Sequence, residues 1–263
     1  MQIRHKNDEQ YFQELAETTR KYILPFIGGH KTIEPGMRVL EIGCGVGGNL
    51  QPFRELGCTI HGIDIAEAKI ESARRLLGDT GQQADVHIAC QDFLTMPAPE
   101  EKFDFIFIHD VIEHIYDKDA FFQGLKAFIK PDGMIYFAFP AWQMPFGGHQ
   151  QICRNKIASH LPFVHILPPR IYRAYLKGLG EGAGTIDELL DIKRCKTPIE
   201  RFRKLVGKHG YSIVKEKLYF INPHYETKFG LKPRKLAGWI SAVPYLRNFF
   251  STTCFYLIKA NED

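Results

Sequence analysis

The fold of this chain is decided by ten consecutive residues, Val39-Leu40-Glu41-Ile42-Gly43-Cys44-Gly45-Val46-Gly47-Gly48. The mostly apolar residues before the first glycine predict a buried strand that stops where the glycines begin. Gly43, Gly45 and Gly48 satisfy the spacing G-x-G-x-x-G between an expected strand and an expected helix. Glycines at such positions let the backbone approach a ligand closely, because no Cβ stands in the way.

Strands and helices alternate on both sides of this loop. A helix is expected over 9–27, before the first strand. The apolar and alternating runs predict strands at 38–42, 58–63, 84–89, 103–108, 134–139, 211–221 and 252–259, and helices at 49–56, 67–77, 117–129 and 198–210. The pattern predicts an α/β, Rossmann-like, doubly wound fold with a seven-stranded, mostly parallel sheet.

The alternation stops after the fifth strand. Residues 141–200 are rich in Pro, Gly, His, aromatic and basic residues, with helical patterns at 169–179 and 185–192. We interpret 141–200 as an inserted cap that contributes to substrate binding, and residues 1–140 together with 201–263 as the core. A chain of 263 residues is long enough for both.

The net charge of +4 is spread unevenly: residues 1–140 carry −7, residues 141–200 carry +3 and residues 201–263 carry +8. The basic part is compatible with an anionic substrate, a membrane surface or nucleic acid, and equally with an ordinary solvated surface. No nucleic-acid-binding module is recognisable. Residues 222–250 mix aromatic and basic side chains, so peripheral membrane contact and a basic flap on the core are both open interpretations.

Three further features bear on localisation. The six cysteines include no C-x-x-C pair, which argues against a zinc ribbon or a thioredoxin-like site. Residues 1–8 begin no apolar segment of the kind found in signal peptides, and the apolar stretch 236–258 is interrupted by Pro244, Arg247 and Asn248. We therefore expect a cytoplasmic protein with reduced thiols, and no feature indicates an oligomeric state.

Two acidic residues narrow the choice of cofactor for the glycine loop. Asp64 ends the second strand 21 residues after Gly43, where a ribose-binding acid is expected for NAD, FAD and S-adenosylmethionine alike. Glu41 precedes the first glycine by two residues, and its carboxylate would repel the pyrophosphate of a dinucleotide. S-adenosylmethionine carries a sulfonium and an ammonium but no phosphate, so Glu41 favours it.

The residues 39–47 resemble the first motif of class I S-adenosylmethionine-dependent methyltransferases. Four other stretches resemble that family in the same order, and together they cover about residues 36–140: Gly62–Ile65, Cys90–Phe93, Phe103–Ile115 and Lys130–Met134. The Glu113-His114 pair is similar to the subgroup that includes the ubiquinone-biosynthesis O-methyltransferases. The 141–200 segment departs from the minimal family pattern, so the resemblance implies no particular acceptor.

The resemblance implies roles for individual residues. Asp64 would bind the ribose hydroxyls, Ile65 would pack on the adenine, and Asp92 with the backbone N–H of Phe93 would bind the adenine edge. The methionine end would be lined by Glu41, Gly43, Cys44, Gly45, Gly47, His109 and Asp110.

Histidines are the candidate bases if the methyl acceptor is a hydroxyl: His109, His114 and His149. Each also fits a purely structural role. Asp110, Glu113 and His114 would share one face if they lay on a helix, and their donor atoms could then hold a divalent ion, although the prediction is that no metal is bound.

The loop after the fifth strand is a candidate for binding the acceptor, because loops at the carboxyl ends of the strands form the ligand sites of such sheets. Trp142, His149, Gln150 and Arg154 are the substrate-binding candidates, and Gly147-Gly148 is a candidate hinge for a lid. Packing between cap and core is the alternative role for all of them.

The sequence therefore predicts transfer of a methyl group from S-adenosylmethionine to a small-molecule, lipid-linked or sugar-linked acceptor, with oxygen favoured over nitrogen. An RNA or protein methyltransferase is an alternative prompted by the basic tail. A non-catalytic cofactor-binding partner subunit is an alternative of another class, and a nicotinamide oxidoreductase is disfavoured by Glu41.

Overall fold

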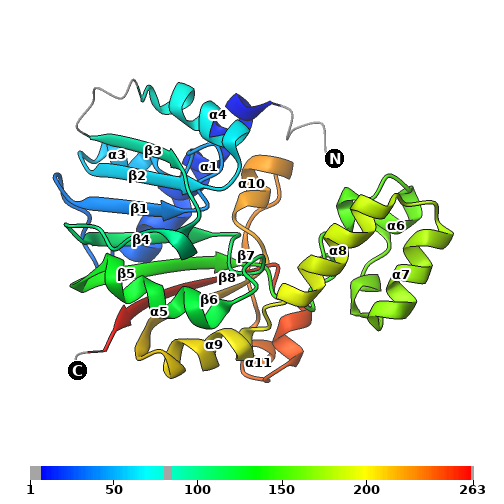
Figure 1. The fold of residues 1–263 in the computed structure, drawn as a ribbon. Helices are drawn as coiled ribbons and strands as arrows, with labels where there is room; N and C mark the ends of the chain where they lie inside the picture. The colour runs from blue at the N-terminus through cyan, green and yellow to red at the C-terminus, as the bar shows by residue number, and fades with distance from the viewer. Residues whose placement is uncertain (1–6, 80–84, 262–263) are drawn as a thin grey trace.

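The computed structural model describes residues 7–79 and 85–261. Their strands are β1 (Arg38–Ile42), β2 (Thr59–Asp64), β3 (Val86–Cys90), β4 (Phe103–His109), β5 (Ile129–Phe139), β6 (Tyr211–Ile221), β7 (Arg234–Lys235) and β8 (Thr253–Ala260). They form one sheet in the order β3-β2-β1-β4-β5-β8-β6-β7 (Figure 1). The strands β1 to β5 are parallel, and β8 runs antiparallel between β5 and β6.

The predicted Rossmann-like fold is confirmed, and the seven predicted strands are all present. The eighth, β7, is a two-residue edge strand that is too short to leave a pattern in the sequence. Ala84, which was included in the third predicted strand, lies outside the described residues. The chain order reverses where β1 lies between β2 and β4, and ligands of open α/β sheets bind beyond the carboxyl ends of the strands at such a point.

Helices cover both faces of the sheet because successive side chains of a strand point to opposite faces. On β4, Phe105 and Phe107 belong to one apolar cluster, whereas Ile106 and Ile108 belong to the other. The first cluster is covered by α3 (Gln51–Glu55), α4 (Glu67–Leu77) and the N-terminal helices, and the second by α5 (Lys118–Phe128) and α9 (Ile199–Lys208).

The N-terminal segment, predicted as one helix, consists of α1 (Asp8–Thr18), a π-helical turn (Thr19–Ile23) and α2 (Leu24–Ile27). The side chain of Asn7 caps α1 by accepting a hydrogen bond from the backbone N–H of Gln10. α1 lies so close to the glycine loop that a Cβ on Gly48 would stand 2.4 Å from the carbonyl oxygen of Phe12. The glycine loop is thus covered by the N-terminus of the chain.

The segment after β5 forms a group of helices beyond the carboxyl ends of the parallel strands (Figure 1). They are α6 (Lys156–His160), α7 (Pro169–Gly178) and α8 (Ala183–Cys195). These helices have an apolar cluster of their own, which includes Tyr172, Leu176 and Leu189. The carboxylate of Glu181 accepts hydrogen bonds from the backbone N–H groups of Arg154 and Asn155, and so fixes the entry into α6.

The segment between β6 and β8 contains α10 (His224–Phe229) and α11 (Gly238–Ser241). α10 packs against α1, so two helices that are far apart in the sequence lie side by side (Figure 1). Among the described residues, no helix is long and apolar enough to cross a membrane.

We predict that Gly48→Ala lowers the free energy of unfolding by about 1–3 kcal/mol, because the added methyl group overpacks the contact with α1. Gly207→Ala on α9 is the matched control, since its Cβ would meet nothing within 4 Å. The control should be neutral or stabilising by up to about 1 kcal/mol. Urea unfolding measures both, and equal stability of the two variants would contradict the close packing of α1 on the loop.

Candidate active site

The glycine loop follows β1 directly and combines close packing with open space. Gly43 has φ +73°, and a Cβ there would stand 2.3 Å from Val111 Cγ2. Gly45 has φ +52°, and a Cβ there would meet nothing within 4 Å, so its backbone faces space in which a ligand fits. Gly47, with φ +80°, packs against Leu77. The first and third glycines are therefore required by packing, and the second leaves room for a ligand.

Glu41 is a fully buried carboxylate at the end of β1. Its Oε1 accepts a hydrogen bond from Asn49 Nδ2 at 2.7 Å, and Asn49 in turn accepts one from Thr19 Oγ1 at 2.9 Å. Oε2 has no donor among the described residues. Burial raises the pKa of the Glu41 carboxyl well above its usual range, and the nearby charge of Asp64 raises it further. A cationic ligand beside Oε2 would relieve both effects.

Asp64 and Ile65 lie at the end of β2 and border a cavity of about 280 Å³. The Asp64 carboxylate accepts hydrogen bonds from the backbone N–H groups of Gly45 and Ala66, each at 2.9 Å, which fixes its position against the loop. Ile65 is 77% exposed although it is apolar. An exposed apolar side chain on the wall of a cavity is suited to pack against a flat ring.

Asp92 and Phe93 border the same cavity from the end of β3. Asp92 is exposed and caps a short 3₁₀ turn by accepting from the backbone N–H of Leu94 at 3.0 Å. The Phe93 ring is buried against Phe121 and Phe128 of α5. The structure thus brings together Gly43, Asp64, Ile65, Asp92, Phe93 and Asp110, which are separated by up to 67 positions in the sequence.

Two tyrosines that the sequence analysis missed lie near this acidic end of the site. The pKa of Tyr11 on α1 is raised by burial and by the charges of Asp110 and Glu41. The pKa of Tyr225 on α10 is raised by burial and by Asp110. Both residues come from helices remote in sequence from the motifs. Only the packing of α1 against α10 places them here, so no local pattern could have identified them.

His109 and Asp110, at the end of β4, have different surroundings, although His109 Nε2 lies 3.9 Å from Asp110 Oδ2. His109 packs among the aromatic rings of Phe107, Tyr136 and Phe255, and burial lowers its pKa. It does not border the 280 Å³ cavity, whereas Asp110 does. Asp110 has φ +54°, a strained conformation for a residue other than glycine, of the kind found at functional sites. The environment of His109 favours the structural alternative over a catalytic role.

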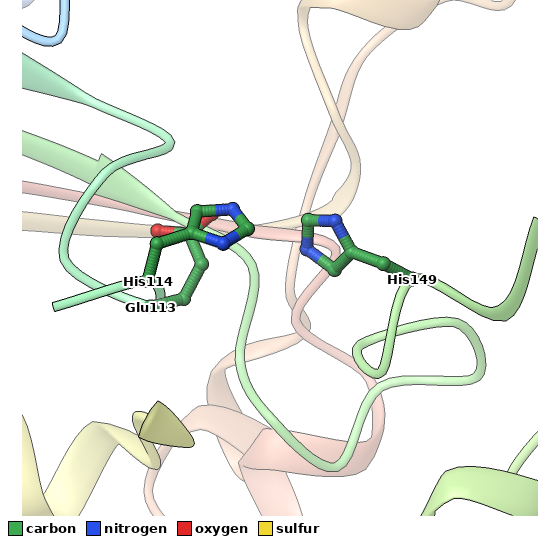
Figure 2. A group of neighbouring side chains, drawn as sticks. All are labelled: Glu113, His114 and His149. Carbon is green, nitrogen blue, oxygen red and sulfur yellow. The ribbon is translucent and has the colours of Figure 1, made fainter. Parts of the chain in front are cut away.

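The condition for a shared helical face of Asp110, Glu113 and His114 is not met: residues 110–114 form a turn, in which the His114 N–H donates to the Val111 carbonyl at 2.8 Å. The left-handed conformation of Asp110 prevents a helix from starting at this position. The turn places His149, rather than Asp110, beside Glu113 and His114 (Figure 2). Potential ligand atoms of Glu113, His114 and His149 all lie within 4.8 Å of one another.

The three side chains share an unusual electrostatic environment. Both carboxylate oxygens of Glu113 are buried and have no partner among the described residues, and burial raises its pKa well above the usual range. The rings of His114 and His149 are 4.9 Å apart and perpendicular. Burial and the neighbouring His149 lower the pKa of His114 to about 4, and burial lowers that of His149. At neutral pH the imidazoles are therefore uncharged.

His114 joins two cavities. It borders the 280 Å³ cavity described above and a second cavity of about 490 Å³. The second cavity is lined by His149 and by residues of α8, among them Glu188 and Asp191. A molecule in the second cavity would therefore contact a side chain that also borders the first.

The other substrate candidates have structural contacts. Trp142 is buried, and its carbonyl accepts a hydrogen bond from His165 Nε2 at 2.8 Å. Gln150 is buried and donates to the Pro145 carbonyl at 2.9 Å. Arg154 is exposed. Of the four candidates, only His149 borders the second cavity, so the geometry favours His149 and places the others in packing or on the surface.

The two glycines of the predicted hinge are tightly packed. A Cβ on Gly147 would stand 2.3 Å from the Trp142 carbonyl oxygen, and one on Gly148 would stand 2.2 Å from His165 Cβ. His149 follows them with φ +56°. The pair thus allows a close-packed turn that holds His149 in place, which does not favour a flexible hinge.

Comparisons with known proteins agree with this geometry. Residues 40–137 match the methyltransferase domain family. The ubiquinone biosynthesis O-methyltransferase of Bartonella bacilliformis is 30% identical over 182 residues, which are 66% of this chain and 72% of that protein. The enzyme of the same name from Bartonella tribocorum is 27% identical over 169 residues, covering 62% of this chain and 68% of the relative.

Two solved structures share the fold. Phosphoethanolamine N-methyltransferase 2 of Haemonchus contortus, in complex with S-adenosyl-L-methionine, has a TM-score of 0.57 at 18% identity and covers 91% of this chain and 52% of that one. Magnesium protoporphyrin IX methyltransferase of Synechocystis PCC 6803, with bound S-adenosylhomocysteine, has a TM-score of 0.52 at 15% identity and covers 94% and 84%.

The chain belongs to the class I S-adenosylmethionine-dependent methyltransferases. The predicted family, enzyme class and cofactor are confirmed. The residues also fit this cofactor on chemical grounds. The unpaired Glu41 Oε2 suits a cation, the open space at Gly45 admits a close ligand, and Ile65 offers an apolar wall beside the Asp64 carboxylate. The individual roles of these residues in this methyltransferase are our proposals.

We predict that Asp64→Asn weakens S-adenosylhomocysteine binding by about 10- to 100-fold, because hydrogen bonds to a charged acceptor contribute about 1.5–3 kcal/mol. Isothermal titration calorimetry measures the dissociation constant. Glu101→Gln, at an exposed acid that pairs with Arg38, is the control and should leave binding unchanged. Wild-type affinity in Asp64→Asn would contradict the proposed ribose site.

Proposed function

We propose that this methyltransferase methylates a hydroxyl oxygen of a small-molecule acceptor that binds in the cavity between His149 and α8. The observation that carries the proposal is the position of His114, which borders both this cavity and the one proposed for the adenosyl group. The acceptor and the methyl donor would then meet at one side chain. Oxygen is supported by the name of the Bartonella bacilliformis relative, an O-methyltransferase at 30% identity.

We also propose the division of labour expected from the sequence, with residues 141–200 as a cap and residues 1–140 and 201–263 as the cofactor-binding core. The apolar cluster shared by α6, α7 and α8 supports it, because these helices can keep their own packing. The lining of the proposed acceptor cavity supports this division as well, because His114 comes from the core and His149 and α8 come from the cap.

The chemistry demands positioning and a proton acceptor. When bound, S-adenosylmethionine supplies an activated methyl group, so the protein has to align the acceptor, exclude water and receive the hydroxyl proton. The imidazoles of His114 and His149 are uncharged at neutral pH and can take that proton. Glu113 is close to both, and burial raises its pKa well above the usual range. A positive charge on either imidazole would favour the ionised form of Glu113, whose negative charge then compensates the new charge.

The walls of the cavity indicate a polar acceptor. Glu188 and Asp191 project from α8 toward the space that His114 and His149 border. Carboxylates accept hydrogen bonds from hydroxyl groups and repel anions. A hydroxyl-bearing head group, free or attached to a sugar or lipid, fits this lining better than an anionic one.

Glu113, His114 and His149 also form a donor set that a divalent cation accepts: one carboxylate and two imidazoles. A cation held there would bind the acceptor oxygen and favour its ionised form. The proton-transfer role needs no such ion, and the experiment below separates the two.

The proposal is tested with S-adenosylmethionine carrying a ¹³C-methyl group and a small-molecule extract, and the label should appear as an O-methyl carbon in NMR spectra.

With the acceptor identified, His149→Gln should lower kcat/KM by about 100-fold or more and leave S-adenosylhomocysteine binding unchanged. His30→Gln, at an exposed histidine, should change neither. Label on nitrogen, or equal losses of binding and turnover, would contradict the proposal. Loss of turnover in EDTA that zinc or magnesium restores would assign the trio to a metal instead.

The pH dependence of kcat/KM gives a second check. A base must be uncharged to accept a proton, and the pKa of His114 is lowered from 6.5 to about 4. Activity that depends on this group is therefore present above its pKa and is lost as the pH falls through about 4. We predict an acidic limb well below pH 6.5 in wild-type kcat/KM profiles. A midpoint near 6.5 would indicate an unperturbed histidine elsewhere.

A further inference from the structure

The exposed apolar side chains of this protein are concentrated in two segments. Fourteen of the twenty large apolar residues that are exposed in the described part of the chain lie within residues 157–171 and 229–250. Trp239 and Tyr245 are the most exposed of them, at 73% and 66%. Single exposed apolar residues are ordinary, but a concentration of this kind marks a surface that a membrane or a binding partner covers.

The two segments meet in space although they are far apart in sequence. The rings of Phe163 and Phe249 are 6.2 Å apart, and both border a shallow hollow of about 530 Å³. The rest of its wall is apolar as well: Ile166, Leu167 and Pro168. The cap and the segment before β8 therefore join at an apolar hollow. We call the exposed residues of 157–171 and 229–250 the cap–tail face.

The two stretches of sequence that contain the cap–tail face carry positive charge and no acids, although Glu200 of α9 lies against them and accepts hydrogen bonds from the Tyr245 N–H and from Arg247. Residues 151–180 contain five Lys or Arg and no Asp or Glu, and residues 227–261 contain six and again none. Residues 1–140, which build the cofactor side, carry −7. The lack of acids in these two stretches, of 30 and 35 residues, coincides with the exposed apolar side chains. This combination is complementary to a surface that is apolar inside and anionic at its boundary.

We infer that the cap–tail face docks this methyltransferase onto an anionic phospholipid surface. Trp and Tyr side chains with neighbouring Lys and Arg are suited to the interface between head groups and acyl chains, where ring and cation are both accommodated. Each Lys or Arg near such a surface contributes about 1 kcal/mol at physiological ionic strength. With no helix able to cross a bilayer among the described residues, the contact is peripheral.

A large apolar cavity opens beside this face. It measures about 610 Å³, and its wall includes Phe229 and Leu231, which are themselves exposed on the cap–tail face. Pro145 also borders it, and the Pro145 carbonyl accepts a hydrogen bond from the Phe163 N–H at 2.8 Å, so the cavity adjoins the Phe163 hollow. On the inner side the wall includes Tyr225, which feels the charge of Asp110 at the cofactor site. Docking would thus bring lipid close to the catalytic end of the sheet.

The inference does not depend on the proposed acceptor and is tested without turnover. The full chain, saturated with S-adenosylhomocysteine, is floated with vesicles of phosphatidylcholine alone or mixed with phosphatidylglycerol. We expect binding to the anionic vesicles only, and a loss of at least about tenfold when ionic strength rises from about 0.05 M to about 0.5 M. Absence of binding to anionic vesicles, or equal binding to neutral ones, would overturn the inference.

Variants locate the contact. Trp239→Glu changes an exposed side chain and should fold normally while it lowers the bound fraction at least about fivefold. Leu56→Glu, at an exposed apolar residue outside both segments, is the control and should bind as wild type. Wild-type binding by Trp239→Glu, or an equal loss in Leu56→Glu, would overturn the inference. So would a wild-type dimer in light scattering that Trp239→Glu dissociates, because the face would then bind a second copy of the chain.

Discussion

The burial of the Glu41 carboxylate is the constraint on which the rest of the site depends. A charged group held out of water is tolerated only when donors or cations surround it, and among the described residues Glu41 has one donor, Asn49. Asn49 is held in turn by Thr19, so the same short chain of hydrogen bonds ties the N-terminal helices to the first strand. The second carboxylate oxygen has no partner in residues 7–79 and 85–261, and the cofactor of this family brings the cationic groups that it needs. Packing of the N-terminus and selection of the cofactor are thus parts of one electrostatic arrangement.

The same reasoning separates the two ends of the site. Around the glycine loop, the charges of Asp64 and Asp110 favour a cation, and a cation beside Glu41 would lower the pKa that burial has raised. At the junction with the cap, Glu113 has a raised pKa and His114 a lowered one, so burial drives both groups toward their neutral forms. A neutral junction suits a proton transfer, because a base that is already charged cannot receive a proton. The protein therefore places strong charge at the cofactor and removes it where the acceptor hydroxyl is expected.

The core was predictable because its residues follow local rules, whereas in residues 141–200 only the helices α7 and α8 were predicted and their arrangement was not. Gly43, Asp64 and Asp92 come at the ends of apolar strands, and parallel strands bring such ends to one edge, so spacing alone places them together. Tyr11 and Tyr225 reach the site only through the packing of α1 on α10, which no local pattern encodes. The spacing of Asp110, Glu113 and His114 would put them on one face only if they lay on a helix. The positive φ of Asp110 starts a turn instead of a helix. This turn places His149, and not Asp110, beside Glu113.

The uneven charge of the chain acquires a physical meaning from this geometry. Among the acidic residues of the first 140 positions, Glu41, Asp64 and Asp110 lie at the proposed site of a cationic cofactor, where attraction lowers the cost of burying charge. Positive residues of the cap and tail surround exposed aromatic side chains, where they add long-range attraction to a short-range apolar contact. The negative charge at the cofactor site and the positive charge of the cap and tail act on different ligands at different distances. The fold therefore does not have to bring them together to neutralise each other. The net charge of +4 is then the sum of a negative charge on residues 1–140 and a positive charge on the cap and tail, and it says little by itself.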